Sequence, residues 1–184
     1  QWILGQLPPS KDWAVQGIEV GVKKGELAGH LLQQEPALYI ALIDRWTPPP
    51  ADSPYRLAGD ECGLATQETY DGWRAEAMAT LAPYMDRAQV LHMDSAAAAA
   101  LLQTRYGLAW ADFAILDADH TFDSRMADLD RYTALVKPGG FVCGGSLHSS
   151  WGGSVGNRAL EEWLKKHGRS GFNRGPSSMW SFRK

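Results

Sequence analysis

Short apolar runs alternate along the chain with segments in which apolar residues recur every three or four positions. The runs, each four to seven residues long, are Val15–Val20, Leu38–Asp44, Gln89–Met93, Phe113–Asp117 and Gly140–Cys143. Runs this short and this apolar are typical of strands that are buried on both faces of a parallel sheet. We therefore predict five parallel strands in these positions.

The segments between the runs have the periodicity of helices. We predict helices over 25–34, 69–85, 95–106, 123–136 and 153–167. Alternation of strands and helices indicates an α/β fold with a doubly wound, mostly parallel sheet. After the last helix, alternating polar and apolar residues at 178–182 predict a C-terminal strand, paired antiparallel to a short strand before it.

The length of 184 residues suits one domain, and we expect residues 1–184 to form it. The segment 45–68 has no clear period and contains three consecutive prolines. Long irregular connections are uncommon unless they are functional, and ligands of α/β sheets bind where strands end. We interpret 45–68 as a lid or substrate loop; the alternative is a tolerated surface insertion.

Composition and charge exclude several classes of protein. The apolar fraction of 45% is that of a globular protein, and no apolar run reaches the roughly 18–20 residues that span a bilayer. The net charge of −3 and the lack of a long basic block argue against a nucleic-acid partner. With no signal-peptide pattern at the start, we expect a cytoplasmic protein. The oligomeric state stays open, a homodimer included.

The two cysteines, Cys62 and Cys143, do not form a CxxC pair, so the sequence contains no zinc or redox motif. Cys143 lies in an apolar run and is expected to be a buried thiol. A disulfide between the two stays open, although a reducing compartment is the simpler expectation.

The first predicted strand ends in a glycine-flanked turn, Glu19 to Gly25. Glycine lets the backbone approach a ligand closely, and the N-terminus of the next helix attracts negative charge. Gly21 and Gly25 are therefore candidate cofactor-binding residues together with Glu19. The turn lacks the GxGxxG pattern, and a tight turn without a ligand is the alternative.

The second strand ends at Asp44, which is placed to accept hydrogen bonds from the hydroxyls of a ribose; a solvated strand end is the alternative. Trp46 either offers an apolar face to an adenine ring or packs in the core. After the third strand, Asp94 and Ser95 either border an adenine, cap the following helix, or do both.

A cluster of ionisable residues follows the fourth strand, at Asp117, Asp119 and His120. Such clusters are typical of catalytic or metal sites. His120 is a candidate general base, and Asp117 is a candidate for orienting the cofactor or binding a hard cation. Capping of the next helix by Asp119 is the alternative. His148, just past the fifth strand, is a further candidate base or a structural histidine.

In combination, these motifs resemble those of the class I S-adenosylmethionine-dependent methyltransferases. The closest resemblance is to small macrocin- and cephalosporin-type O-methyltransferases, which have a motif of the type Asp-Gly-Asp-His-Ser-Tyr. The matching segments here are Glu19–Gly25, Ile43–Trp46, Asp117–Phe122 and Leu135–Gly140. The resemblance covers roughly Gly17 to Gly168 and implies a Rossmann-like, seven-stranded sheet.

The resemblance also implies roles for individual residues. Glu19 and Gly21 would face the methionine end of the cofactor, Asp44 would hold the ribose, and Asp117 would lie near the sulfonium. Metal-dependent relatives have an acidic pair after the fifth strand, where this chain has Gly144 to His148 without a carboxylate. A magnesium site is therefore doubtful, with Asp117, Asp119 and His148 as the only candidate ligands.

The sequence therefore predicts methyl transfer from S-adenosylmethionine to an oxygen of a small-molecule acceptor, with Asp117, His120 and His148 as candidate catalytic residues. A nicotinamide-dependent oxidoreductase on the same sheet is one alternative. A non-catalytic cofactor-binding protein is the other.

Overall fold

The structure is a computed structural model that describes residues 2–7, 14–57, 59, 61–145 and 153–184, the side chains of 153–157 excepted. A seven-stranded sheet of order β3-β2-β1-β4-β5-β7-β6 forms its centre. The strands are β1 Val15–Val20, β2 Leu38–Asp44, β3 Ala88–His92, β4 Ala111–Leu116, β5 Val136–Gly144, β6 Asn173–Arg174 and β7 Trp180–Arg183. β1 to β5 are parallel, and β7 is antiparallel to both β5 and β6. The predicted Rossmann-like, doubly wound fold is confirmed.

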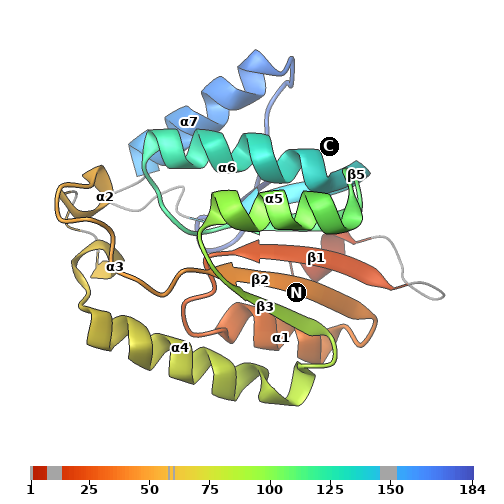
Figure 1. Cartoon of the computed structure of the whole chain (residues 1–184). Coiled ribbons are helices and arrows are strands. Elements are labelled where there is room, and N and C mark those ends of the chain that lie inside the picture. Colours follow the sequence, from red (N-terminus) through yellow and green to blue (C-terminus); the bar gives the residue numbers. More distant parts are fainter. Residues whose placement is uncertain (1, 8–13, 58, 60, 146–152) are drawn as a thin grey trace.

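Helices cover both faces of the sheet (Figure 1). One face carries α5 Ser95–Tyr106, α6 Phe122–Leu135 and α7 Gly153–Lys166; the other carries α1 Glu26–Gln34 and α4 Gln67–Leu81. Two 3₁₀ turns, Leu4–Gln6 and Ala82–Tyr84, complete these layers. Each layer has its own buried apolar cluster, which explains why the strands are apolar on both faces.

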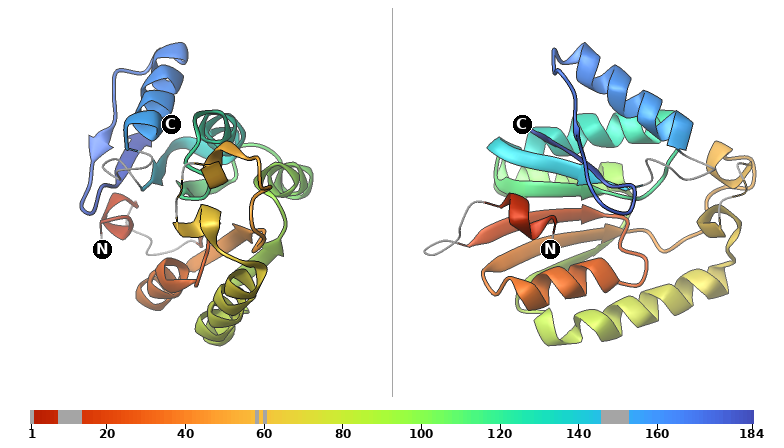
Figure 2. Two further views of the ribbon diagram at one scale, coloured as in Figure 1. Left: turned by 90° about the vertical axis from the view of Figure 1, so that its left-hand side faces the viewer. Right: turned by 180° about the vertical axis from the view of Figure 1, so that it is seen from behind.

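The segment 45–68 differs from the prediction in one respect, because it contains two short helices, α2 Pro54–Leu57 and α3 Glu61–Leu64. Both lie beyond the carboxyl ends of the strands, in front of the sheet when it is viewed end-on (Figure 2). α4 also starts at Gln67, two residues before the predicted helix, because Thr66 caps it by accepting a hydrogen bond from the Thr69 amide.

The strand order reverses between β1 and β4, whose next neighbours are β2 and β5. Ligands of open α/β sheets bind in the crevice at such a switch point, outside the carboxyl ends of the strands. The fold therefore directs attention to the turns that follow β1 and β4.

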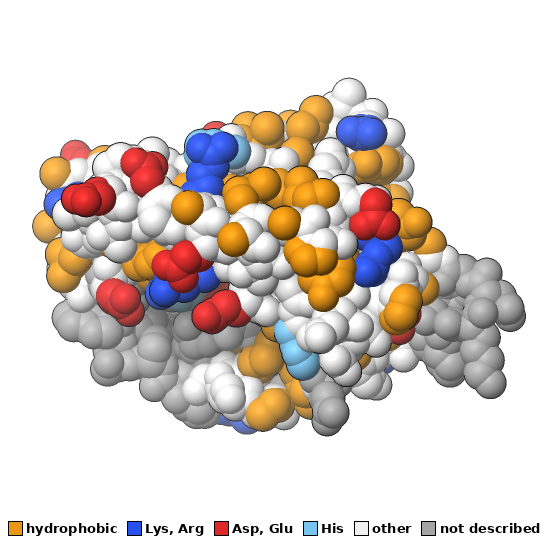
Figure 3. Space-filling model, turned by 90° about the horizontal axis from the view of Figure 1, so that it is seen from below, with side chains coloured by type: hydrophobic (Ala, Val, Ile, Leu, Met, Phe, Trp, Pro, Cys, Tyr) orange, Lys and Arg blue, Asp and Glu red, His pale blue; other side chains and the backbone are white. Residues whose placement is uncertain are grey.

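The cysteines, the helix lengths and the surface charges were also subjects of prediction. Cys62 and Cys143 do not form the disulfide that the sequence left open. None of the described helices is long and apolar enough to cross a bilayer. Acidic and basic side chains are interspersed on the face seen in Figure 3.

Candidate cofactor and acceptor site

A cavity of about 490 Å³ lies at the carboxyl edge of the sheet, at the switch point. Eight of the residues predicted from the sequence line it: Glu19, Gly21, Asp44, Asp94, Ser95, Asp117, Asp119 and His120. Gly25 and Trp46 lie outside its lining, and His148 lies outside the described residues. The structure thus gathers residues from Glu19 to His120, which are 101 positions apart in the chain, around one cavity.

The turn after β1 is packed directly against the end of β4. Gly21 has a φ of +94°, and a Cβ atom there would overlap the backbone carbonyl of Asp117. Gly25 also has a positive φ, +75°, and a Cβ atom there would lie 3.2 Å from the Cα of Ala77 in α4. Gly21 therefore keeps β1 and β4 close at the cavity, whereas Gly25 allows α1 and α4 to pack, a role the sequence prediction missed.

Asp44 holds this turn in place. One carboxylate oxygen accepts hydrogen bonds from the amides of Val22 (3.0 Å) and Lys23 (2.9 Å), and the other accepts one from the amide of Trp46 (2.8 Å). The two turns, after β1 and after β2, are thereby tied to one carboxylate. A carboxylate has about four acceptor positions, so Asp44 retains capacity for one further donor.

Trp46 is a core residue rather than a wall of the cavity. Its side chain is 1% exposed, and its indole N–H donates to the carbonyl of Lys23 at 2.8 Å. The ring packs edge-on against His92. The packing alternative considered for Trp46 therefore matches its position, and the indole braces the same turn that Asp44 holds.

Glu19 is a buried acid at the base of the cavity. Its side chain is 2% exposed, and its Oε2 atom has no hydrogen-bond partner among the described residues. Burial raises the pKa of this carboxyl well above its usual value, and the nearby carboxylates of Asp117 and Asp44 raise it further. An unpartnered polar atom in such a place is costly unless a ligand or water meets it.

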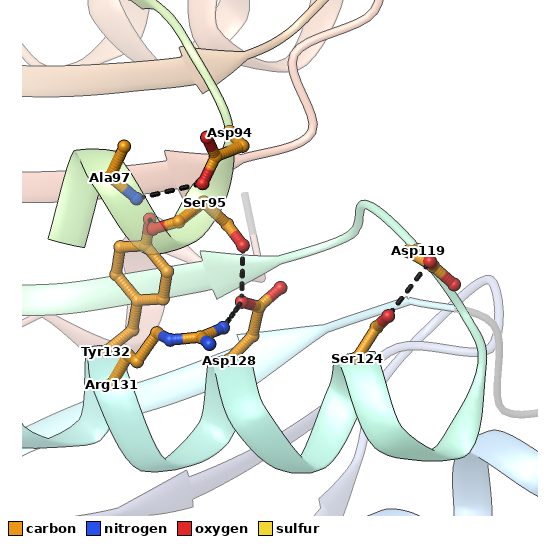
Figure 4. A network of polar contacts seen from close by, with 8 residues as sticks. All are labelled: Asp94, Ser95, Ala97, Asp119, Ser124, Asp128, Arg131 and Tyr132. Carbon is orange, nitrogen blue, oxygen red and sulfur yellow. Dashed lines mark hydrogen bonds and ion pairs between the residues drawn. The ribbon is translucent and has the colours of Figure 1, made fainter. Parts of the chain in front are cut away.

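At the other wall of the cavity, Asp94 caps α5 by accepting a hydrogen bond from the Ala97 amide at 2.9 Å. The next residue, Ser95, donates its hydroxyl to Asp128 (2.7 Å) in α6, and Arg131 donates to the same carboxylate oxygen (3.3 Å). This network joins α5 to α6 along the cavity (Figure 4).

Tyr132 completes the network by donating its hydroxyl to the Ser95 carbonyl at 2.8 Å. Burial raises the pKa of Asp128, and its bonds to Ser95 and Arg131 oppose that rise. Asp128 and Arg131 line the cavity but were not identified from the sequence, because a charged pair on a helix is usually solvated.

All three residues of the cluster after β4 line the cavity, and Asp119 also caps the start of the following helix. Both carboxylate oxygens of Asp119 are engaged, one with the Thr121 amide (2.8 Å) and one with the Ser124 hydroxyl (2.9 Å). The capping alternative for Asp119 thus matches its contacts. Asp117 is exposed at the cavity.

The ring of His120 meets a buried arginine that sequence analysis did not single out. Nδ1 of His120 lies 2.7 Å from a terminal nitrogen of Arg125, a residue that is 4% exposed. Arg125 also donates to the carbonyl of Gly145, at the end of β5 (3.3 Å). A buried arginine gives no distinct signal in a sequence, because most arginines on a helix are solvated.

Candidate metal ligands do not assemble in the part of the chain that the structure describes. No group of three His, Cys, Asp or Glu residues with metal-binding geometry occurs there. Of the three proposed ligands, Asp119 is occupied by capping, and His148 falls in the stretch 146–152, which is outside the described residues. The donor set formed by the described side chains does not fit a three-ligand magnesium site.

The segment 45–68 closes the outer side of the cavity through Tyr55 and Cys62, which both line it. The Tyr55 ring packs edge-on against His120, with ring centroids 6.3 Å apart. α4 supports the segment, since the Tyr70 hydroxyl donates to the Cys62 carbonyl at 2.9 Å. Tyr55 was also missed in the sequence, because an aromatic residue in a proline-rich loop has no distinguishing pattern.

A doubly wound sheet with an acid-rich cavity at its switch point defines a protein of the α/β cofactor-binding class. The family model for the methyltransferase domain matches residues 18–146, which is more than half of the chain. The chain therefore belongs to the methyltransferase domain family.

Solved structures of methyltransferases share the fold. An O-methyltransferase from Bacillus cereus in complex with SAH has a TM-score of 0.63 at 15% identity, over 93% of this chain and 74% of that chain. The TDP-rhamnose 3'-O-methyltransferase of calicheamicin biosynthesis has a TM-score of 0.61 at 16% identity, over 99% and 76%.

A putative caffeoyl-CoA O-methyltransferase from Staphylococcus aureus has a TM-score of 0.59 at 14% identity, over 92% of this chain and 76% of that chain. No curated protein matches the sequence. At identities this low, the structural likeness establishes the fold.

Proposed function

We propose that this chain is a class I S-adenosylmethionine-dependent methyltransferase that methylates a hydroxyl group of a small molecule. The observation that supports the proposal best is the cavity itself: in a chain of the methyltransferase domain family, Glu19, Asp44, Asp94 and Asp117 meet there from the ends of four strands. The motif resemblance to macrocin- and cephalosporin-type O-methyltransferases favours an oxygen acceptor. No described feature favours the nicotinamide alternative.

The residues present fit the methyl donor. The cavity has the size of a small-molecule site. The unpartnered oxygen of Glu19 is suited to the ammonium group of the methionine end, and the remaining acceptor capacity of Asp44 is suited to a ribose hydroxyl. Asp94 and Ser95 would border the adenine, and Gly21 lets the turn after β1 approach the end of β4 beside the cavity.

When bound, S-adenosylmethionine supplies an electrophilic methyl group on a sulfonium. The chain would position the acceptor hydroxyl in line with that methyl and accept its proton. Asp117, a carboxylate exposed to the cavity, is our candidate base. His120 contacts Tyr55 of the lid and would help to place the acceptor. The third candidate, His148, stays a prediction.

We further propose that residues 1–184 act as one domain with 45–68 as its lid. Closure of the lid over Asp117 and His120 would exclude water from the methyl group. Tyr55 and Cys62 would then form part of the acceptor pocket.

Calorimetric titration tests the cofactor proposal. S-adenosylmethionine and S-adenosylhomocysteine should both bind with dissociation constants in the micromolar range, about −8 kcal/mol. NADH serves as the control and should not bind. The proposal would be contradicted if neither S-adenosylmethionine nor S-adenosylhomocysteine binds, or if NADH binds tightly.

A further inference from the structure

Arg125 is a buried cation that contacts three residues next to the cavity: His120, Gly145 and Trp180. It lies in the first turn of α6, outside the lining of the cavity. Its guanidinium contacts Nδ1 of His120 at 2.7 Å and the Gly145 carbonyl at 3.3 Å, and it lies over the Trp180 ring, 5.7 Å from its centroid. The loop after β4 and the end of β5 are thus tied to one side chain.

The charge of Arg125 determines which way its bond to His120 runs. Burial lowers the pKa of the guanidinium, and the carboxylates of Asp117, Asp128 and Asp119 oppose that change. A guanidinium has five N–H donors and no acceptor, and it stays protonated in proteins. The imidazole must therefore be the acceptor in this bond, through Nδ1.

An imidazole that accepts at Nδ1 carries its ring proton on Nε2. Placing a proton on Nδ1 would remove the hydrogen bond and bring two N–H donors to 2.7 Å of each other. Asp117 and Asp119 both precede His120 in the chain, and the Tyr55 ring packs edge-on against the imidazole. The contact with Arg125 engages a particular ring nitrogen of His120, Nδ1.

We propose that Arg125 is a positioning residue that fixes the ring proton of His120 on Nε2, so that His120 donates a hydrogen bond in the cavity and does not act as the base. The meaning of this arrangement for catalysis rests on the proposed function. On that function, S-adenosylmethionine would supply its methyl group to the acceptor oxygen and would keep the electron pair of the sulfur–methyl bond on sulfur. The hydroxyl proton passes to the Asp117 carboxylate, and Nε2–H of His120 orients the acceptor oxygen.

The position of the proton can be measured without knowing the acceptor. The 184-residue chain labelled with ¹⁵N-histidine contains five histidines, and H120Q identifies the signals of His120 in a long-range ¹H–¹⁵N correlation spectrum. At neutral pH, the wild-type spectrum should show a protonated Nε2 and an unprotonated Nδ1 for His120. A protonated Nδ1 would overturn the proposal.

R125M tests whether Arg125 is the cause. Methionine retains much of the apolar volume and removes every donor, so the difference between the two His120 nitrogen shifts should shrink toward that of a mixed tautomer. R74M, at an exposed arginine of α4, is the matched control and should leave the His120 signals unchanged. A wild-type His120 pattern in R125M would overturn the proposal. If R125M does not fold, the wild-type spectrum still shows whether the ring proton of His120 lies on Nε2, and a proton on Nδ1 would still overturn the proposal.

S-adenosylmethionine titrations of the same samples separate this proposal from the proposed function. R125M should bind the cofactor within about threefold of wild type, because Arg125 does not line the cavity. If wild-type protein does not bind S-adenosylmethionine, the proposed function fails, while the position of the His120 proton still tests the role of Arg125.

Discussion

The two halves of the cavity are built in different ways. In the half formed by the turns after β1 and β2, glycine contacts and backbone amides determine the shape, and Asp44 accepts three of those amides. In the half formed by the end of β4 and by α6, side chains determine it, with Arg125 behind the lining holding His120 and the Gly145 carbonyl. The first half resembles a rigid cradle that a common cofactor can share, whereas the second is suited to a particular acceptor.

The two halves of the cavity should also differ in how much a single substitution lowers the free energy of unfolding. A backbone-built turn leaves no alternative partner when its one carboxylate or its lack of a Cβ atom is changed, so single substitutions there should be costly. A side-chain cluster can repack, so substitutions in the second half should change the chemistry more than the stability. Substitutions at four residues of the first half test the expectation for that half.

The largest effect is expected from Gly21→Ala. The added methyl would overlap the Asp117 carbonyl, and the φ of +94° is itself unfavourable for alanine. We expect the free energy of unfolding to fall by about 3 kcal/mol or more, measured by urea denaturation. Cofactor binding should be lost, because β1 and β4 must separate at the cavity.

Gly168→Ala is the matched control for this substitution. Gly168 also has a positive φ, +66°, but a Cβ atom there would meet nothing within 4 Å. Its cost should be about 1 kcal/mol, which is the strain of the backbone alone. Equal losses in the two variants would show that the contact between the first turn and the end of β4 is not what makes Gly21 sensitive.

The second effect is expected from Asp44→Ala, which leaves the amides of Val22, Lys23 and Trp46 without their acceptor. We expect a loss of about 2–4 kcal/mol and a cofactor affinity at least about tenfold weaker. Asp94→Ala removes one capping bond of the same kind and should cost only about 1 kcal/mol. Similar stabilities of the two variants in urea denaturation would contradict the idea that Asp44 supports a whole turn.

The fold could be predicted well from the sequence because its signals are local. Continuous apolar runs predicted strands such as Val15–Val20 and Leu38–Asp44 at their observed bounds. The helices inside 45–68 could not be predicted, because four residues are too few for a period to appear. They form at the edge of the sheet, where α4 supports them through the bond from Tyr70 to the Cys62 carbonyl.

The site shows the same division between local and distant signals. Glu19, Gly21 and Asp44 end or follow strands, so their place at one sheet edge follows from the parallel topology. Arg125 and Tyr55 reach the site through contacts that depend on how α6 and the lid pack, which no local pattern encodes. Trp46 lies only two residues after Asp44, but its backbone φ of +41° is part of a turn that directs its ring into the core.

The third prediction concerns the pH dependence of Glu19. Its pKa in the folded protein is raised above the ordinary value of 4.5, mainly by burial. A raised pKa contributes stability below the unfolded value, and that contribution is lost as the pH rises through the folded value. As the pH rises from 4.5 through the folded value, wild-type protein should therefore lose stability that Glu19→Gln, which cannot ionise, keeps.

Thermal melts across this range measure the difference between the two proteins, which should widen with pH in favour of the variant. Glu161→Gln, at an exposed glutamate of α7, is the control and should follow the wild-type curve. Parallel curves for wild type and Glu19→Gln would mean that Glu19 is ionised in the folded protein despite its burial.

The smallest effect on cofactor binding is expected from Trp46→Phe. The substitution removes the bond from the indole to the Lys23 carbonyl, so stability should fall by about 1–2 kcal/mol. Because the ring lies outside the lining of the cavity, affinity for S-adenosylmethionine should change by less than about threefold in calorimetry. A large loss of affinity with stability intact would instead mean that the indole meets the adenine, and that the first half of the cavity also relies on side chains to recognise its ligand.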